Sequence, residues 1–148
     1  MRTEPLPDKL HFVLPDDREK PSGGNIYNRY LVEALEKLGQ PVEICSLTRY
    51  REALEKGQPG IFGVDSLFVD ALRGEQLKSA GIFSFFILHH LQSLHPPKGA
   101  SGDALFEREE RQVLEQFDLI LATSDFSRDY LRQKQLKLPV VVVEPALP

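Results

Sequence analysis

The sequence predicts an α/β protein, a Rossmann-like three-layer sandwich around a mostly parallel six-stranded sheet. Six short apolar runs recur along the 148 residues, and turn-forming residues bound each run, as is typical of buried parallel strands. Segments of helical periodicity or high charge separate the runs. Because crossovers between parallel strands are right-handed, this alternation indicates a sheet with helices on both faces. We expect the strand order 3-2-1-4-5-6.

The first strand and the first helix form the unit around which the chain is organised. Residues 10–14 are an apolar run, and a polar loop leads from them to Ser22-Gly23-Gly24. Apolar side chains at three- and four-residue spacing then predict a helix over residues 25–38. Gly39 ends this helix, because glycine readily adopts the left-handed conformation found just past a helix end.

The later elements continue the alternation. The sequence predicts further strands at 42–47, 63–67, 82–88, 118–122 and 140–143. It predicts a short charged helix or turn at 48–56, a helix at 68–79, and helices that begin after a cap at Ser101 or Asp103 and after a cap at Thr123 or Ser124. Residues 82–88 are the most apolar run and predict a central strand. Residues 91–103 are rich in Pro, Gly and Ser and predict a long loop, which favours a functional role.

Length and composition limit the classes of protein that fit. The length favours one domain over residues 10–148, after a polar lead-in at residues 1–9. The net charge of −4 and the pI near 5.6 speak against nucleic-acid binding, which needs a basic face. Cys45 is the only cysteine, so no internal disulfide forms, and we expect a buried core residue in a reducing compartment. No apolar run is long enough to span a membrane. We therefore expect a cytoplasmic protein, with peripheral membrane contact left open.

Two segments distant in sequence are expected to meet at one crevice. In the expected strand order the switch point lies between the first and fourth strands, and ligands bind there, at the carboxyl ends. This brings Ser22-Gly23-Gly24 with Asn25 to the pair His89-His90. The glycine loop offers backbone N–H groups at a helix N-terminus, which suit an anionic group. Two plainer interpretations stay open: the glycines are only a turn, and the histidines are only satisfied by backbone groups. Asp65-Ser66 either ends a strand in the same crevice or caps the next element.

Several familiar sites do not fit the sequence. Neither the dinucleotide fingerprint G-x-G-x-x-G nor a Walker loop is present. A metal site is not expected, because adjacent histidines on a strand point to opposite faces and no Cys, Asp or Glu set completes a site. A complete small reductase is therefore the weakest of the enzyme hypotheses.

Four stretches resemble the N-terminal domain of GT-B glycosyltransferases of family 4. PSGGNIYNRYLVEALEKLGQPVEI resembles its glycine loop and first helix, although Gln40 stands where the family commonly has histidine. FFILHHL resembles the strand after which a histidine follows. FEREERQVLEQFDLILATSDFSRDYL resembles the glutamate-bearing helix, the next strand and its serine, and VVVVEPALP resembles the strand that enters the interdomain link. The resemblance covers nearly the whole chain, with the four motifs in the family's order.

The resemblance implies a metal-independent, retaining glycosyltransferase that transfers a hexosyl group. This chain would be its acceptor-side domain, with a sugar or glycan as acceptor. The donor, a nucleotide sugar, would be held by a C-terminal domain that these residues do not include, so the chain alone is expected to be inactive. No further cofactor is implied.

The resemblance also implies roles for individual residues. Gly23 and Gly24 would offer N–H groups to phosphate or acceptor, and Ser22, Asn25 and His90 would line the same substrate site. His89 is the better match to the histidine near the transferred sugar, with His90 as the alternative, and His89 is the expected catalytic residue. Ser124 matches the serine after the fifth strand and is expected to bind substrate. Glu109 or Glu110 matches the helix glutamate, with a structural role.

A second hypothesis belongs to another class of protein. The chain would be a stand-alone Rossmann-like module that binds a small anionic ligand or a protein partner. The module is favoured if the exposed side of the last strands and the 91–103 loop present no partner-facing apolar patch, and if a phosphorylated ligand binds the 22–24 loop with micromolar affinity.

Overall fold

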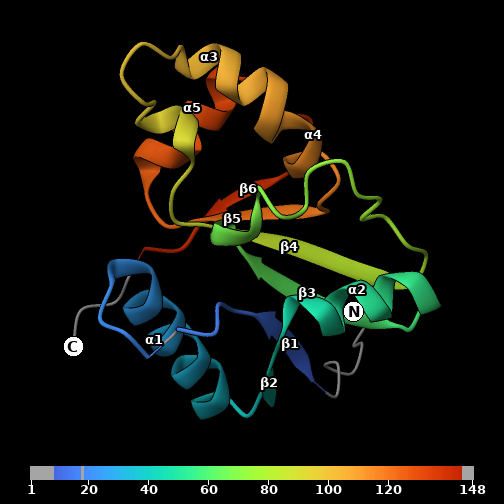
Figure 1. Ribbon diagram of the computed structural model, residues 1–148. Helices are drawn as coiled ribbons and strands as arrows, with labels where there is room; N and C mark the ends of the chain where they lie inside the picture. The colour runs from blue at the N-terminus through green and yellow to red at the C-terminus, as the bar shows by residue number, and fades with distance from the viewer. Residues whose placement is uncertain (1–8, 18, 145–148) are drawn as a thin grey trace, which may run out of the picture.

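The computed structural model describes residues 9–17 and 19–144 and confirms the predicted fold class. Six parallel strands form one sheet in the order β2-β1-β3-β4-β5-β6 (Figure 1). The strands are β1 (Leu10–Val13), β2 (Val42–Cys45), β3 (Gly60–Asp65), β4 (Ile82–Leu88), β5 (Leu119–Ala122) and β6 (Val140–Val142). Residues 1–8 of the expected lead-in, and the last four residues of the family-like VVVVEPALP stretch, lie outside the described residues.

The position of β3 differs from the order 3-2-1-4-5-6, which places the third strand at the outer edge. In the structure β3 pairs with both β1 and β4. Gly63 explains why β3 fits there: a Cβ on it would lie 2.3 Å from Phe85 Cζ and 2.9 Å from Phe12 Cδ1. The two phenylalanines of the flanking strands therefore meet edge to face across the glycine, with ring centroids 5.8 Å apart. A side-chain-free position in the middle of β3 lets the neighbouring strands pack their rings over it.

The edge strand β2 is less buried than the strands inside the sheet. Ile44 is 41% exposed, which suits an edge better than the centre. Cys45, expected in the core, is half-buried and packs against the core from its rim. Burial raises the pKa of its thiol to about 11, so the thiol stays protonated at neutral pH and is a packing residue.

The helices cover the two faces of the sheet unequally. On one face lies α1 (Gly23–Lys37), whose Tyr27 and Val32 pack on Phe12 and Ile87. The opposite face carries the larger core, packed against α2 (Leu47–Lys56), α4 (Arg111–Leu114) and α5 (Asp125–Gln133). Figure 1 shows α1 by itself at the lower left, with the α3, α4 and α5 group at the top.

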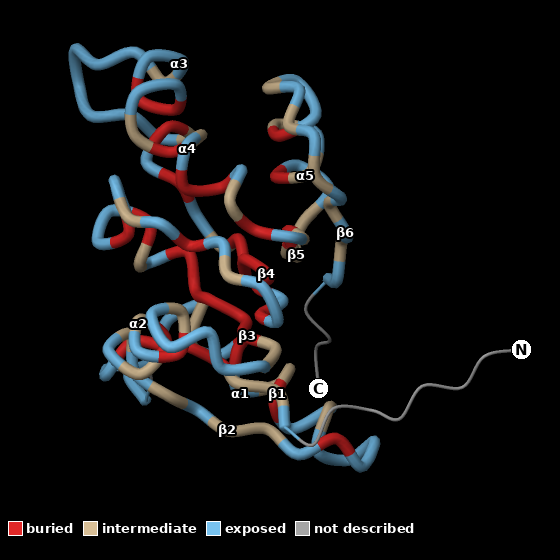
Figure 2. The backbone as a smooth tube through the Cα atoms, turned by 90° about the vertical axis from the view of Figure 1, so that its right-hand side faces the viewer, coloured by how far each residue is buried: buried red, intermediate tan, exposed pale blue. Residues whose placement is uncertain are grey.

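The face that α1 packs on is incompletely covered over the last strands. Phe83 and Phe85 share this face of β4, and Val141 of β6 lies in register with Leu121, which belongs to the same face. Phe83 is 44% and Val141 46% exposed. Along the backbone, β4 is mostly buried, whereas β6 is intermediate or exposed (Figure 2). Among the described residues, α1 is the helix that contributes to the core on this side.

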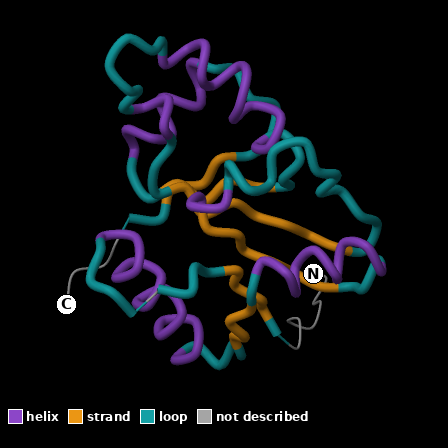
Figure 3. The backbone as a smooth tube through the Cα atoms, viewed as in Figure 1, coloured by secondary structure: helices purple, strands orange, loops and turns teal. Residues whose placement is uncertain are grey.

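The predicted strand at 63–67 begins earlier, at Gly60, and the helix predicted at 68–79 does not form. A 3₁₀ turn, η1 (Ser66–Phe68), follows β3, and the next residues are turns and loop (Figure 3). Gly74 has a φ of 77°, outside the helical region. Side chains from other elements replace the intrahelical bonds: Gln116 accepts from Leu77 N and donates to the Glu75 carbonyl. The apolar spacing reflects burial of Leu72 and Leu77 in a loop.

The helix predicted after Ser101 forms, but with a wide turn in it. Ser101 caps α3 (Gly102–Leu105), which runs through a π-helical turn, η3 (Phe106–Glu110), into α4. Such turns rotate the following residues by one position. Here the turn ends on Glu110, whose side chain is buried and accepts a bond from Ser93 N in the 91–103 loop.

The remaining predicted elements are confirmed with small shifts in their bounds. α1 begins two residues before the predicted residue 25, β5 ends at the predicted Ala122, and Ser124 caps α5. A short 3₁₀ turn, η2 (Gln92–Leu94), lies in the predicted loop. No helix in the part of the chain that the structure describes is both long and apolar enough to cross a membrane.

Candidate functional site

A pocket of about 720 Å³ lies at the carboxyl ends of the central strands. The loop after β1, the first turn of α1, the end of β3 with η1, and the residues after β4 form its walls. Its lining includes Ser22, Gly24, Asn25, His89 and His90. This is the edge of the sheet where α/β proteins bind ligands, and here the sheet brings residues 22–25 and 89–90 together.

Gly24 and His89 are in direct contact. A Cβ placed on Gly24 would lie 3.4 Å from Cγ and Cδ2 of the His89 ring. Tyr27 packs edge to face with the same ring, with centroids 5.2 Å apart. Gly24 and Tyr27 are both in the first turns of α1, so the start of this helix contacts the imidazole through a backbone surface and an aromatic ring.

A chain of hydrogen bonds continues from His89 into the protein. His89 Nε2 lies 2.9 Å from Asn28 Oδ1, and Asn28 Nδ2 donates to Asp65 Oδ2 at 2.7 Å. Asp65 Oδ1 accepts from Leu67 N at 2.8 Å and so caps η1. Asn28 and Asp65 are 2% and 4% exposed. Asp65 therefore has both of the roles considered from the sequence, because it caps η1 and also lies at the end of β3 in the crevice.

The backbone after β4 is fixed from the same side. Ser66 Oγ accepts from His89 N at 3.1 Å and from His90 N at 3.3 Å. His90 stacks on His95 of the 91–103 loop, with ring centroids 5.4 Å apart and planes 11° apart. The two adjacent histidines thus differ in surroundings, since His89 faces α1 and His90 faces the loop.

Burial decides the charge state of His89. Its side chain is 15% exposed, and removal from water lowers the pKa of the imidazole, while the Asp65 carboxylate, 3.6 Å from Nε2, raises it by a smaller amount. The ring is therefore neutral at neutral pH. Burial also raises the pKa of Tyr27 to about 12, so its hydroxyl remains a donor, and it donates to the Val143 carbonyl at 2.7 Å.

The described part of the pocket lining carries more carboxylates than cations. Among the residues that the structure describes, Asp17, Asp65 and Asp70 line the pocket, together with one lysine, Lys20. The Gly23 and Gly24 N–H groups at the start of α1 have no acceptor among the described residues, as expected for the first turn of a helix. Carboxylates with free N–H donors suit a ligand that carries hydroxyl groups, because a hydroxyl both donates and accepts.

The structure divides the predicted site residues into two groups. Ser22, Gly24, Asn25, His89 and His90 line the pocket. Ser22 caps α1, and Asn25 Nδ2 closes the preceding loop by donating to the Asp17 and Lys20 carbonyls. Ser22 and Asn25 therefore also have structural roles.

Gly23 and Ser124 lie outside the pocket lining. Nothing is within 4 Å of a Cβ on Gly23. Ser124 Oγ accepts from Ser127 N and caps α5, so its hydroxyl is occupied by the helix. Of the two candidate glutamates, Glu110 has the buried structural position, whereas Glu109 pairs with Arg73 near the surface.

Asn28 is the site residue that sequence reasoning missed. It lies one helical turn after Gly24, on the same side of α1. An asparagine among apolar residues on the buried side of a helix is the signal that could have drawn attention to it, because a buried amide needs partners.

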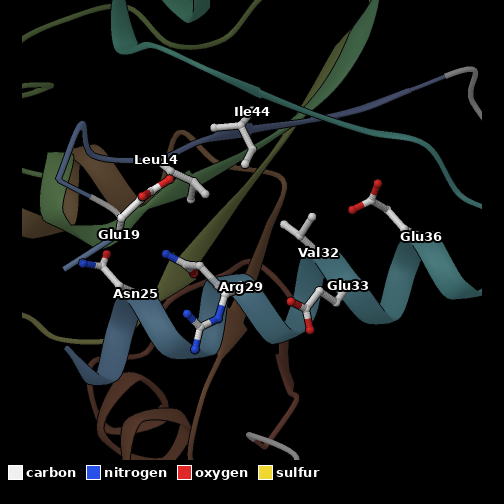
Figure 4. A pocket seen from close by; sticks show the side chains of 9 residues that line it. Leu14, Glu19, Asn25, Arg29, Val32, Glu33, Glu36 and Ile44 are labelled. Atoms are coloured by element: carbon white, nitrogen blue, oxygen red, sulfur yellow. The ribbon is translucent and has the colours of Figure 1, made fainter. Parts of the chain in front are cut away.

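A second pocket, of about 480 Å³, lies on the other side of α1 (Figure 4). Leu14, Val32 and Ile44 are its apolar lining residues, and Arg29 of α1 lines it as well. Three glutamates line it as well: Glu19, Glu33 and Glu36. Asn25 lines both pockets, and Asn28, the hydrogen-bond partner of His89, lines this one, so the two pockets adjoin at the start of α1.

Comparisons with known proteins leave the family open. No protein-family model matches the sequence, and no curated protein matches it. Within residues 9–17 and 19–144, no group of three or more His, Cys, Asp or Glu side chains is arranged to hold a metal ion. The function is therefore argued from the geometry of the His89 pocket.

Proposed function

We propose that this chain is the acceptor-side domain of a nucleotide-sugar-dependent, retaining glycosyltransferase and is inactive without a donor-binding half. The contact between Gly24 and His89 carries the proposal. It sets an open helix N-terminus and a neutral imidazole beside each other at the carboxyl ends of the strands. A family-4 acceptor domain, which the sequence resembles, needs these two features in one crevice.

The carboxylates in the pocket support a sugar as the ligand of this chain. Among the residues that the structure describes, three aspartates and one lysine line the pocket, and carboxylates accept hydrogen bonds from hydroxyl groups. Position and hydrogen bonding, rather than a pair of catalytic carboxylates, would then assist transfer.

The incompletely covered sheet face supports a larger assembly. Phe83 and Val141 are each more than two-fifths exposed on the side of β4–β6 away from the main core. Exposed apolar side chains on an uncovered sheet face mark a contact with another structure. A donor-binding half that packs here would cover the open part of this face.

A second candidate function rests on the Gly24 N–H group, which has no acceptor among the described residues. Lys20 lines the same pocket, and the two groups together could hold a small anion in a stand-alone binding module. Inorganic phosphate is the simplest probe of this alternative.

Saturation-transfer NMR on the full chain tests the proposal. Glucose, galactose, mannose and their disaccharides are the sugar probes, and the ³¹P linewidth of inorganic phosphate, measured with and without the chain, reports binding of the anion. We expect a sugar signal that His89→Gln removes and that the control Phe126→Ser, on the exposed side of α5, retains. Binding of phosphate without any sugar would favour the binding module. Turnover of a nucleotide sugar by the chain alone would contradict the proposed division of labour.

A further inference from the structure

We infer that Asp65 and Asn28 are positioning residues that fix which nitrogen of His89 carries the proton, so that Nδ1 presents a lone pair to the pocket. That the lone pair accepts a hydrogen bond from a sugar hydroxyl rests on the proposed function. The direction of the hydrogen bonds among Asp65, Asn28 and His89 is independent of that function, because it follows from the contacts alone.

The argument begins at Asp65, whose two carboxylate oxygens are both occupied. Oδ1 accepts from Leu67 N at 2.8 Å, and Oδ2 accepts from Asn28 at 2.7 Å. A carboxylate accepts at both oxygens and donates at neither. The group of Asn28 that faces Asp65 must therefore be its NH₂.

The orientation of Asn28 then decides the orientation of His89. With Nδ2 turned to Asp65, Oδ1 is turned to His89 Nε2, 2.9 Å away. An amide oxygen only accepts, so Nε2 must carry the proton. In a neutral imidazole the other nitrogen, Nδ1, is then the acceptor.

The position of the unprotonated Nδ1 determines what kind of ligand group it can contact. The ring lines the pocket, and Nδ1 lies 3.8 Å from where a Cβ of Gly24 would be. It has no hydrogen-bond partner among the residues that the structure describes. Nδ1 can thus accept a hydrogen bond from a hydroxyl group, whereas it repels the oxygen of a phosphate or a carboxylate.

The substitution Asp65→Asn should reverse the direction of the hydrogen bonds that link residue 65, Asn28 and His89. In Asp65→Asn the Leu67 N–H still requires an acceptor, which holds the new amide oxygen at the Oδ1 position and turns its NH₂ toward Asn28. Asn28 must then present its oxygen to residue 65 and its NH₂ to His89. Nε2 becomes an acceptor, and the proton moves to Nδ1.

Two-bond ¹H–¹⁵N correlation spectra of the imidazole rings test the inference at a pH above 7. His89→Gln assigns the His89 signals among the four histidines. We expect protonated Nε2 in the wild type and protonated Nδ1 in Asp65→Asn. Protonated Nδ1 in the wild type, or protonated Nε2 retained in Asp65→Asn, would overturn the inference.

A second variant keeps the test decisive if Asp65→Asn does not fold. In Asn28→Asp the buried carboxyl groups of residues 28 and 65 share one proton between them, and the other oxygen of residue 28 still accepts from His89. Nε2 should therefore remain protonated, and its deprotonation would overturn the inference. These spectra need no sugar or nucleotide. Protonated Nε2 without any sugar binding would therefore refute the proposed function alone. Sugar binding with protonated Nδ1 in the wild type would refute only the inferred roles of Asp65 and Asn28.

Discussion

Gly24 packs its α-carbon against the face of the His89 imidazole, although 64 residues lie between them in the chain. A Cβ at position 24 would contact two ring carbons at 3.4 Å, while a Cβ on the neighbouring Gly23 would meet nothing within 4 Å. The two adjacent glycines therefore form a natural pair of test and control positions.

Gly24→Val should impair ligand binding far more than folding, because its methyl groups must push the His89 ring out of place. We expect roughly a tenfold or larger loss of sugar affinity and a fall of about 1 kcal/mol or less in the free energy of unfolding, since position 24 gains helix propensity over glycine. Gly23→Val is the control and should bind normally. Chemical denaturation and the NMR binding assay measure the two quantities. Equal losses in Gly23→Val and Gly24→Val would mean that the glycines serve only the turn.

Gly63→Ala should destabilise the sheet, because the added methyl would lie 2.3 Å from Phe85 Cζ at a buried position. Overpacking of a core costs about 1–3 kcal/mol. The double variant Gly63→Ala/Phe85→Leu should recover part of the loss relative to the sum of the single variants. Urea denaturation of the four proteins gives the coupling, and strictly additive losses would show that the ring is not the obstacle.

His89 should make the protein less stable as the solution becomes acidic. Burial lowers its pKa in the folded chain, whereas the unfolded value is about 6.5. The unfolded state therefore takes up the proton first, so the stability present above about pH 6.5 is lost as the pH falls toward the folded pKa, by at most about 1.4 kcal/mol per pH unit. His89→Gln lacks this titration, and its unfolding free energy should fall less steeply in that window. If the wild type instead gained stability relative to His89→Gln as the pH falls, the attraction of the protonated imidazole to Asp65 would outweigh the effect of burial on the pKa of His89.

Tyr50 and Ser84 should behave as a coupled buried pair. Their hydroxyl oxygens are 2.9 Å apart, and the residues are 0% and 2% exposed. Tyr50→Phe should cost about 1–3 kcal/mol, because it leaves the serine hydroxyl without its partner. Ser84→Ala in the Tyr50→Phe background should cost less than Ser84→Ala alone. Tyr30→Phe, at a half-buried position on α1, is the control and should change the unfolding free energy by less than about 0.5 kcal/mol. A double variant as unstable as the sum of its parts would contradict the coupling.

The local pattern of the chain predicted most of its elements but not all of their types. The apolar repeat that Gly39 ends predicted α1, and the run at 82–88 predicted β4, because these signals are contained in neighbouring residues. Residues 68–79 show the limit. Their spacing fits a helix, but Gly74 and the side chains of Arg51 and Gln116, which reach them from distant elements, stabilise a loop instead.

The sequence predicted the two segments that form the candidate site but not the buried residues that connect them. Gly24 and His89 each follow a strand, so the rule that ligands bind at the carboxyl ends placed them together. Asn28 and Asp65 could not be assigned in this way. Each has an ordinary local role, on a helix and at a cap, and their pairing appears only when α1 lies across the end of β3.

By itself the sequence determined the fold class, the alternation of strands and helices and the two segments that form the pocket, because hydrophobic periodicity, caps and glycines act over a few residues. Only the tertiary structure decided that β3 lies between β1 and β4, that part of one sheet face is left open, and that Asp65 reaches His89 through Asn28. These features depend on contacts between residues far apart in the chain, such as the rings of Phe12 and Phe85 that meet over Gly63. Their energies depend on the distances and directions of packed groups, which no short stretch of sequence contains.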